Sequence, residues 1–216
     1  MREKTCCFTG HRDLPTSRQA ELSIKLEECI ISLIERGVRY FGAGGALGFD
    51  TLAAQTVLNL KNRYPNIKLI LVLPCLSQTR GWPAKDVEEY ERIKTQADKV
   101  VYTSQQYTKG CMFKRNRHLV DNSGVCVCYL TRDSGGTAYT VDYAEKQGLE
   151  VINLASTQDS KLTHQNSSRQ DRRLVHAENK SIITSPALDY GEIKCIASER
   201  TKPDRALSVY FYLLPN

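Results

Sequence analysis

The sequence predicts an α/β fold with a doubly wound, mainly parallel sheet and a C-terminal extension. Short apolar segments that suit buried strands alternate with longer segments whose apolar residues recur at helical spacing. One of the short apolar segments, Lys68–Leu73, is the continuous apolar run that is typical of a central parallel strand. Two strand-to-helix turns contain glycines, and such turns converge at the sheet edge where open α/β sheets bind ligands.

Length and composition indicate one domain with an appendage. The chain has 216 residues and a net charge of +6, which permits an anionic ligand without requiring one. No apolar run is long enough for a membrane span and no signal peptide is recognisable, so we expect a cytoplasmic protein. The eight cysteines include no C-x-x-C pair and lie mostly in apolar runs, so we expect core residues and no metal site.

The first expected strand, Lys4–Phe8, is followed directly by a polar turn. Thr9, the backbone at Gly10, and Arg12 are candidate contacts for an anion; an ordinary turn with a solvated arginine is an equally weighted alternative.

The first expected helix is structural. Thr16 and Gln19 have the spacing of a capping box at its start, and Gly37 is placed to end it. Its apolar face is formed by Leu22, Leu26, Cys29 and Leu33.

The stretch Gly42–Ala54 contains four glycines and joins the second expected strand to a helix. Glycine permits positive φ and close backbone approach, so the loop can admit an anionic group to the helix N-terminus; the alternative is a turn that only packs helix on strand. Asp50 can cap the helix or contact a ligand ribose. On either interpretation we expect Asp50→Asn to leave the stability nearly unchanged and to weaken ligand binding. The candidate ligand contacts are Gly44, Gly45, Gly48 and Asp50.

Beyond the central strand Lys68–Leu73, the segment Pro74–Pro83 is expected to be a loop at the same sheet edge. Its Trp82 either stacks on a base or pins the loop to the domain, and we favour the pin. Asp86–Ala97 predicts a helix and Asp98–Tyr102 a short strand.

The stretch Gln105–Asn122 is the second polar centre of the chain and leads into a helix. Cations near a helix start can hold a phosphate or a nucleic-acid backbone, whereas the alternative is a solvated basic face. Cys111 is a weaker candidate as a nucleophile, since no Cys-His pair follows from the spacing. The polar members are Lys114, Arg115, Asn116 and Arg117.

A second glycine turn follows the expected strand Val125–Leu130 and opens the expected helix Ala138–Gln147. The strand Glu150–Leu154 completes the domain, which we place at residues 1–155. The candidate ligand contacts in this turn are Gly135, Gly136 and Thr137.

The composition then shifts. Residues 156–185 have the composition of a polar linker, and residues 186–216 form a short strand-like tail with candidate strands at Glu192–Ala197 and Leu207–Leu214. A hairpin of this size is marginal alone, so we expect it to dock, to meet a partner or to stay disordered.

Four motifs in this order give the sequence a specific resemblance. From about Thr5 to Leu154 it resembles the YpsA-like family of the SLOG superfamily, a group of Rossmann-like domains related to LOG phosphoribohydrolases and to the DNA-processing protein DprA. The motifs are Cys-Cys-Phe-Thr-Gly-His-Arg (6–12), Gly-Gly-Ala-Leu-Gly-Phe-Asp (44–50), Gly-Cys-Met-Phe-Lys-Arg-Asn (110–116) and Gly-Gly-Thr-Ala-Tyr-Thr-Val (135–141).

The resemblance implies a nucleotide-derived ligand, and the relatives point in two directions. LOG enzymes hydrolyse the N-glycosidic bond of nucleoside monophosphates and carry a Gly-Gly-x-Gly-Thr-x-x-Glu motif, whereas here the turn continues Thr137-Ala138-Tyr139 and reaches Asp142. The run Arg115–Arg117 is instead similar to a DprA segment at a single-stranded DNA surface. The implied ligand contacts are Gly10, Gly45, Gly48, Asp50, Gly135, Gly136 and Thr137.

We therefore expect a protein that senses or processes a nucleotide-derived small ligand bound at the carboxyl edge of the sheet. One alternative is a nucleotide N-glycosidase-type hydrolase, with Asp50 and Arg115 as its catalytic residues. The other is DprA-like binding of single-stranded nucleic acid. We expect no cofactor, no metal and no membrane partner, and we expect a homo-oligomer.

Overall fold

A computed structural model describes residues 1–155 of the chain. All six strands form one parallel sheet in the order β4-β3-β2-β1-β5-β6. The strands are β1 (Thr5–Gly10), β2 (Tyr40–Ala43), β3 (Lys68–Leu73), β4 (Lys99–Tyr102), β5 (Val125–Tyr129) and β6 (Glu150–Asn153). The expected doubly wound α/β fold is confirmed, and the sheet is parallel throughout.

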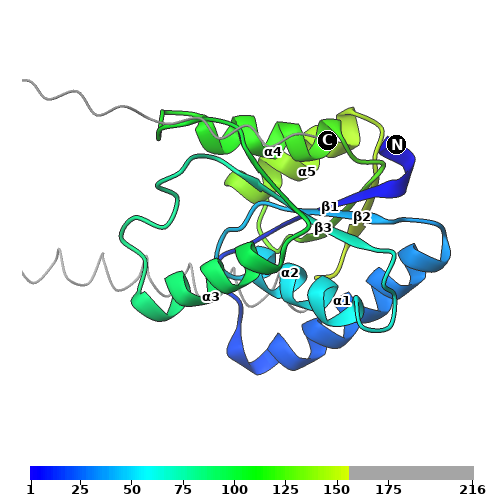
Figure 1. The fold of residues 1–216 in the computed structure, drawn as a ribbon. Helices are drawn as coiled ribbons and strands as arrows, with labels where there is room; N and C mark the ends of the chain where they lie inside the picture. The colour runs from blue at the N-terminus through cyan, green and yellow to red at the C-terminus, as the bar shows by residue number, and fades with distance from the viewer. Residues whose placement is uncertain (156–216) are drawn as a thin grey trace, which may run out of the picture. The chain divides into compact units, whose positions relative to one another are not determined.

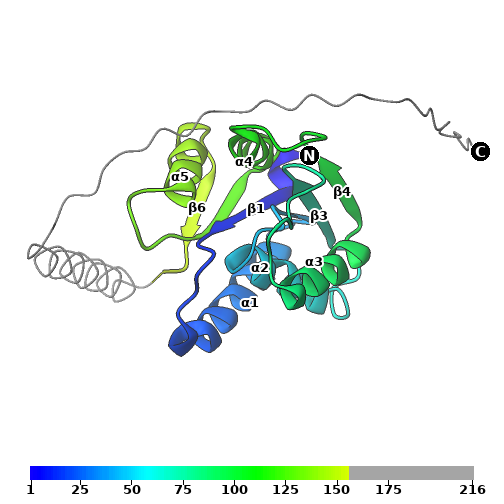
Figure 2. The ribbon, with the colours of Figure 1, turned by 90° about the vertical axis from the view of Figure 1, so that its left-hand side faces the viewer.

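Helices cover both faces of the sheet. Figure 1 shows α1, α2 and α3 below the sheet and α4 and α5 above it, and Figure 2 shows the same two layers from the side. The helices are α1 (Gln19–Glu35), α2 (Phe49–Leu60), α3 (Ala84–Gln96), α4 (Cys111–Asp121) and α5 (Gly136–Lys146). This coverage explains why the central strands are apolar on both sides.

The strand order reverses beside β1. The chain runs outward from β1 through β2 and β3 to β4, then returns across the sheet so that β5 pairs with the other side of β1. In open α/β sheets the connections diverge at such a switch point and leave a crevice at the carboxyl ends of the two strands. The residues that follow β1 and β5 therefore face each other there.

The core is built from the inward side chains of these strands and helices. Phe8 of β1 and Phe41 of β2 stack with their ring centroids 6.1 Å apart, and both are fully buried. Six of the seven cysteines within the described range are buried, as the sequence predicts, and Cys29 is half-buried. Burial raises the pKa of the Cys128 thiol to about 12, so this thiol stays protonated and acts as a small apolar side chain.

Three helix starts differ from the sequence prediction. Helix α3 begins at Ala84, two residues before the expected Asp86. The capping box of Thr16 and Gln19 is wrong: Thr16–Arg18 forms a 3-10 turn, and α1 begins at Gln19 without a side-chain cap in the described structure. Helix α5 begins at Gly136, two residues before the expected Ala138, so that Thr137 lies in its first turn.

Other local predictions are confirmed. Gly37 follows α1 with a φ of 97°, and its N–H donates to the carbonyl of Ile34. Trp82 packs edge-on against Tyr90 of α3 with ring centroids 5.7 Å apart, so it pins its loop to the domain. None of the helices within residues 1–155 is long and apolar enough to cross a membrane. The expected linker and tail, 156–185 and 186–216, lie outside the described residues.

Candidate ligand site at the switch point of the sheet

A cavity of about 470 Å³ opens between the carboxyl ends of β1 and β5. Its lining comes from the last residues of β1, the loops after both strands, and α2, α4 and α5. The expected strand end at Phe8 is wrong, because β1 extends to Gly10 and includes Thr9. The predicted site residues among its lining are Thr9, Gly10, Arg12, Asp50, Arg115, Asn116, Gly135, Gly136 and Thr137. The structure therefore brings nine of the twelve candidates together, and the exceptions are Gly44, Gly45 and Gly48.

The first glycine loop is filled by a side chain of its own helix. The Asp50 carboxylate accepts the backbone N–H of Ala46 at 3.3 Å and also hydrogen-bonds the backbone at Gly44. The Phe49 N–H donates to the carbonyl of His11 at 3.1 Å. Because these amides are already used within the chain, the loop does not present them to an anion.

Three glycines of this first loop are required by the packing of the chain around them. A Cβ at Gly44 would lie 1.2 Å from Nη1 of Arg115, and one at Gly45 would lie 2.7 Å from the side chain of Leu73. Gly48 has a φ of 74°, and a Cβ there would lie 2.1 Å from the carbonyl oxygen of Arg12. This packing accounts for the three glycines without a ligand, and ligand contacts at Gly44, Gly45 and Gly48 stay a prediction.

Asp50 forms a buried ion pair with Arg115 of α4. Oδ2 of Asp50 lies 3.2 Å from Nη1 of Arg115, and each residue is only 6% exposed. Burial raises the pKa of the Asp50 carboxyl above its usual range, and the neighbouring guanidinium opposes this rise. The pair explains why Asp50 is neither a simple helix cap nor a free ligand contact.

Arg115 keeps an unused donor. Its Nε is buried and has no hydrogen-bond partner among residues 1–155, although Arg115 lines the cavity. A buried N–H without an acceptor costs about 1–3 kcal/mol.

The second glycine turn is open where the first is filled. A Cβ at Gly135 or Gly136 would meet no described atom within 4 Å, and both glycines line the cavity. No side chain within the described range caps α5, so the N–H groups of its first turn are available. A helix N-terminus of this kind favours an anion.

Asn116 joins α4 to this turn. Its Nδ2 donates to Oγ1 of Thr140 at 2.7 Å, and Thr140 Oγ1 donates to the carbonyl of Gly136 at 2.7 Å. Thr140 is 2% exposed. The sequence analysis missed Thr140, although its position one helical turn after Gly136 could have suggested it.

Further lining residues were also missed. His11 is buried, and its Nε2 accepts the backbone N–H of Thr131 at 3.0 Å, which joins the loops after β1 and β5. The polar run directly after β5 was the available signal, because residues after neighbouring parallel strands meet at one edge. The missed residues that line the cavity are Phe8, His11, Asp13, Ala46, Met112, Arg132 and Ser134.

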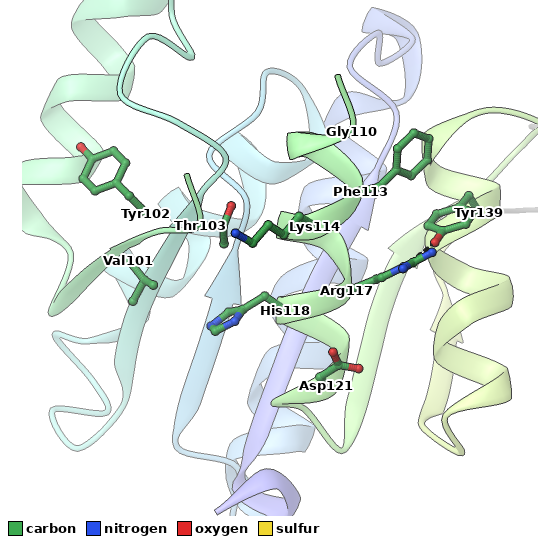
Figure 3. A pocket seen from close by; sticks show the side chains of 10 residues that line it. All are labelled: Val101, Tyr102, Thr103, Gly110, Phe113, Lys114, Arg117, His118, Asp121 and Tyr139. Carbon is green, nitrogen blue, oxygen red and sulfur yellow. Dashed lines mark hydrogen bonds between the residues drawn. The ribbon is translucent and has the colours of Figure 1, made fainter. Parts of the chain in front are cut away.

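A second, more open hollow of about 750 Å³ lies along the outer side of α4 (Figure 3). Figure 3 shows Arg117 pointing toward Tyr139 of α5, and its Nε donates to the Tyr139 hydroxyl at 2.7 Å. Lys114 and His118 lie on the side of α4 that faces the end of β4. Arg115 and Arg117, predicted as one basic run, thus belong to different sites.

The structure gives little support to the other chemistry considered. Cys111 is 2% exposed, and within residues 1–155 no group of three His, Cys, Asp or Glu side chains is placed to hold a metal. Asp142, which stands where LOG enzymes have Glu, is exposed and pairs with Lys146 at 2.7 Å. It does not line the cavity.

The sequence matches the model of one protein family. The model of the YpsA family, described as the YspA SLOG family, matches residues 10–156. UPF0398 protein BH1768 of Halalkalibacterium halodurans is 33% identical over 141 residues, which cover 64% of this chain and 72% of that protein. UPF0398 protein YpsA of Bacillus subtilis (strain 168) is 28% identical over 121 residues, 55% of this chain and 67% of that protein.

Two solved structures share the fold. DNA processing protein A (DprA) from Streptococcus pneumoniae has a TM-score of 0.56 at 19% identity, covering 73% of this chain and 53% of its own. DprA from Helicobacter pylori, whose structure concerns its single-stranded DNA binding mode, has a TM-score of 0.51 at 20% identity, covering 70% and 65%. The chain thus spans less than two thirds of either DprA chain.

Proposed function

The chain belongs to the YspA SLOG family, and from this premise we propose that it binds a nucleotide-derived small ligand in the cavity at the switch point. The observation that carries the proposal is the unpartnered Nε of Arg115, a buried cationic donor in the wall of a cavity that also contains an open helix N-terminus. Both features favour an anionic oxygen.

The phosphate of the ligand is proposed to lie at the second glycine turn. Gly136 and Thr137 start α5, where backbone N–H groups and the helix dipole together favour negative charge. Arg12 and Arg132, exposed at the cavity rim, add positive charge that attracts the phosphate from solution.

The volume of the cavity suits a ligand of mononucleotide size. At about 470 Å³ it falls within the range of roughly 300–1,000 Å³ that is common for small-molecule sites. Asp50 holds the Arg115 guanidinium in place through their ion pair, so in this proposal Asp50 positions a ligand-binding residue.

Hydrolysis of an N-glycosidic bond is less well supported. It needs a carboxylate beside the ribose, and among the described residues the carboxylates that line the cavity are Asp13 and Asp50. Asp50 is engaged by Arg115 and by the amides of its own loop. We therefore propose binding without turnover as the primary function.

The test is thermal unfolding with AMP and adenosine as probes. AMP should raise the melting temperature with the logarithm of its concentration, and adenosine should act much more weakly because it lacks the phosphate. Gly136→Val should remove the AMP effect without lowering the melting temperature of the free protein, because its side chain enters open space. Ala84→Val, at the equivalent first position of α3, is the matched control. Equal shifts in both variants would contradict the proposal.

Single-stranded nucleic acid is a second candidate, favoured by the surface of α4. Phe113 is 46% exposed there, beside Lys114 and the Arg117–Tyr139 pair, and cations with aromatic rings suit a stacked single strand. The H. pylori DprA, which shares the fold, binds single-stranded DNA. Salt-sensitive oligonucleotide binding that Arg117→Ala weakens, with no response to AMP, would favour this candidate.

A further inference from the structure

We propose that His11 is a positioning residue, which holds the loop 130–135 between β5 and α5 ready for an anion and releases that loop when its imidazole is protonated. The inference rests on the proposed function, because the loop leads to the second glycine turn. It adds a pH-dependent control of the same site.

The imidazole of His11 connects the two strands of the switch point. His11 follows β1 directly, is 7% exposed, and accepts the Thr131 N–H through Nε2 at 3.0 Å. Thr131 follows β5 after one residue and is itself 7% exposed. The edge of the imidazole also packs against the ring of Tyr129, with centroids 6.2 Å apart.

The hydrogen bond between His11 and Thr131 requires a neutral imidazole. Because Nε2 of His11 accepts the Thr131 N–H, the neutral ring carries its proton on Nδ1. A doubly protonated imidazolium has no acceptor left, so the Thr131 N–H would face a second N–H in a buried position. One of the two groups must then move.

The surrounding charges act on His11 from both loops. Burial is the main reason that the pKa of His11 is lowered from its ordinary value; the Arg132 guanidinium lowers it further and the Asp13 carboxylate opposes this. Asp50 and Arg115 also line the cavity, but they are paired with each other. His11 is therefore neutral near pH 7, and it becomes charged only at a lower pH than an ordinary imidazole.

Movement of Thr131 is transmitted along a short loop. Arg132 is the next residue, and Gly135 begins the open turn three residues later. Release of Thr131 would displace these groups and weaken anion binding, whereas the added charge of an imidazolium would by itself strengthen it. The sign of the pH effect thus separates positioning by His11 from simple electrostatics.

The binding test uses inorganic sulfate, which keeps its charge in mildly acidic solution. Between about pH 7.5 and about pH 5 the affinity of the wild type for sulfate should fall roughly fivefold to tenfold, as for one lost buried hydrogen bond. His11→Gln retains an acceptor that does not titrate, so its sulfate affinity should stay constant over this range. His118→Gln, on the exposed outer side of α4, should behave as the wild type. An affinity that rises on acidification, or an unchanged pH profile in His11→Gln, would overturn the inference.

A second measurement needs no ligand. The measured quantity is the protection of the Thr131 amide against hydrogen exchange, which is its exchange rate compared with the intrinsic rate at each pH. This protection should decrease over the pH range in which the NMR signals of His11 titrate. In His11→Gln the protection should not decrease. Constant protection in the wild type would refute the role of His11. If the Thr131 amide loses protection but sulfate does not bind at any pH, His11 positions the loop and the proposed anion site is wrong.

Discussion

Substitution of Gly44 tests the buried ion pair of the site most severely. A methyl group added there would lie 1.2 Å from Nη1 and 2.3 Å from Cζ of Arg115, and 2.7 Å from Oδ2 of Asp50. The guanidinium cannot remain in place beside this methyl group. Gly44→Ala should therefore break the ion pair even though it adds only one carbon atom.

The expected cost follows from what is broken. Separating a buried ion pair and leaving its charges uncompensated costs about 3–5 kcal/mol. Because Arg115 borders the cavity and can shift partly into it, we expect the lower end, about 3 kcal/mol. For a domain of this size each kcal/mol lowers the melting temperature by about 2–4 °C, so a decrease of roughly 6–12 °C should follow.

The assay is equilibrium unfolding by heat and by urea, without ligand. Gly136→Ala is the matched control, because its methyl group meets no described atom within 4 Å, and its stability should equal or slightly exceed that of the wild type. The reasoning also predicts coupling: in an Arg115→Met background, Gly44→Ala should cost little, since the clash with the guanidinium is gone. A wild-type melting temperature for Gly44→Ala, or an equal cost in both backgrounds, would refute it.

Three further predictions follow from the same contacts. The buried ion pair reverses the expectation from sequence that Asp50→Asn is nearly silent in stability. Asp50→Asn should cost about 3 kcal/mol in urea unfolding because it leaves a buried guanidinium without its counter-charge, whereas Asp142→Asn on the exposed face of α5 should be nearly neutral; equal effects would contradict the buried pair. Gly48→Val should lower the melting temperature of the ligand-free protein, since its Cβ would overlap the carbonyl of Arg12; a variant that loses only ligand binding would be inconsistent with this packing role. A chain that ends at Ala155 should unfold cooperatively and retain the AMP response; insoluble protein would show that later residues complete the domain.

The fold could be predicted because its signals are local. Apolar runs such as Lys68–Leu73 and the glycine turns identify strands and helix starts without knowledge of distant contacts. The site edge followed from one further rule, that residues after parallel strands meet at the same edge. The helix start at Thr16 was wrong because Thr16 already lies inside the 3-10 turn Thr16–Arg18, whereas a capping residue must have a non-helical backbone.

The roles of the individual site residues could not be predicted, because they depend on contacts between residues that are far apart in the sequence. Asp50 and Arg115 are 65 residues apart in sequence, and His11 and Thr131 are 120 apart. The placement of Arg115 and Arg117 in different sites could have been predicted, since residues two positions apart on a helix point about 200° apart. Both turns contain glycines, and this shared feature hid different environments, because the first loop is filled by Asp50 and the turn at Gly136 is open.

The most direct test of the proposed ligand site is an NMR titration of the isotope-labelled protein with AMP, followed at individual backbone amides. Saturable shifts are expected at Gly135, Gly136 and Thr137, together with a shift of the Arg115 side-chain Nε–H, and much weaker changes are expected with adenosine. Shifts confined to α4 residues such as Phe113 and Arg117, or equal responses to AMP and adenosine, would contradict a phosphate bound at the start of α5.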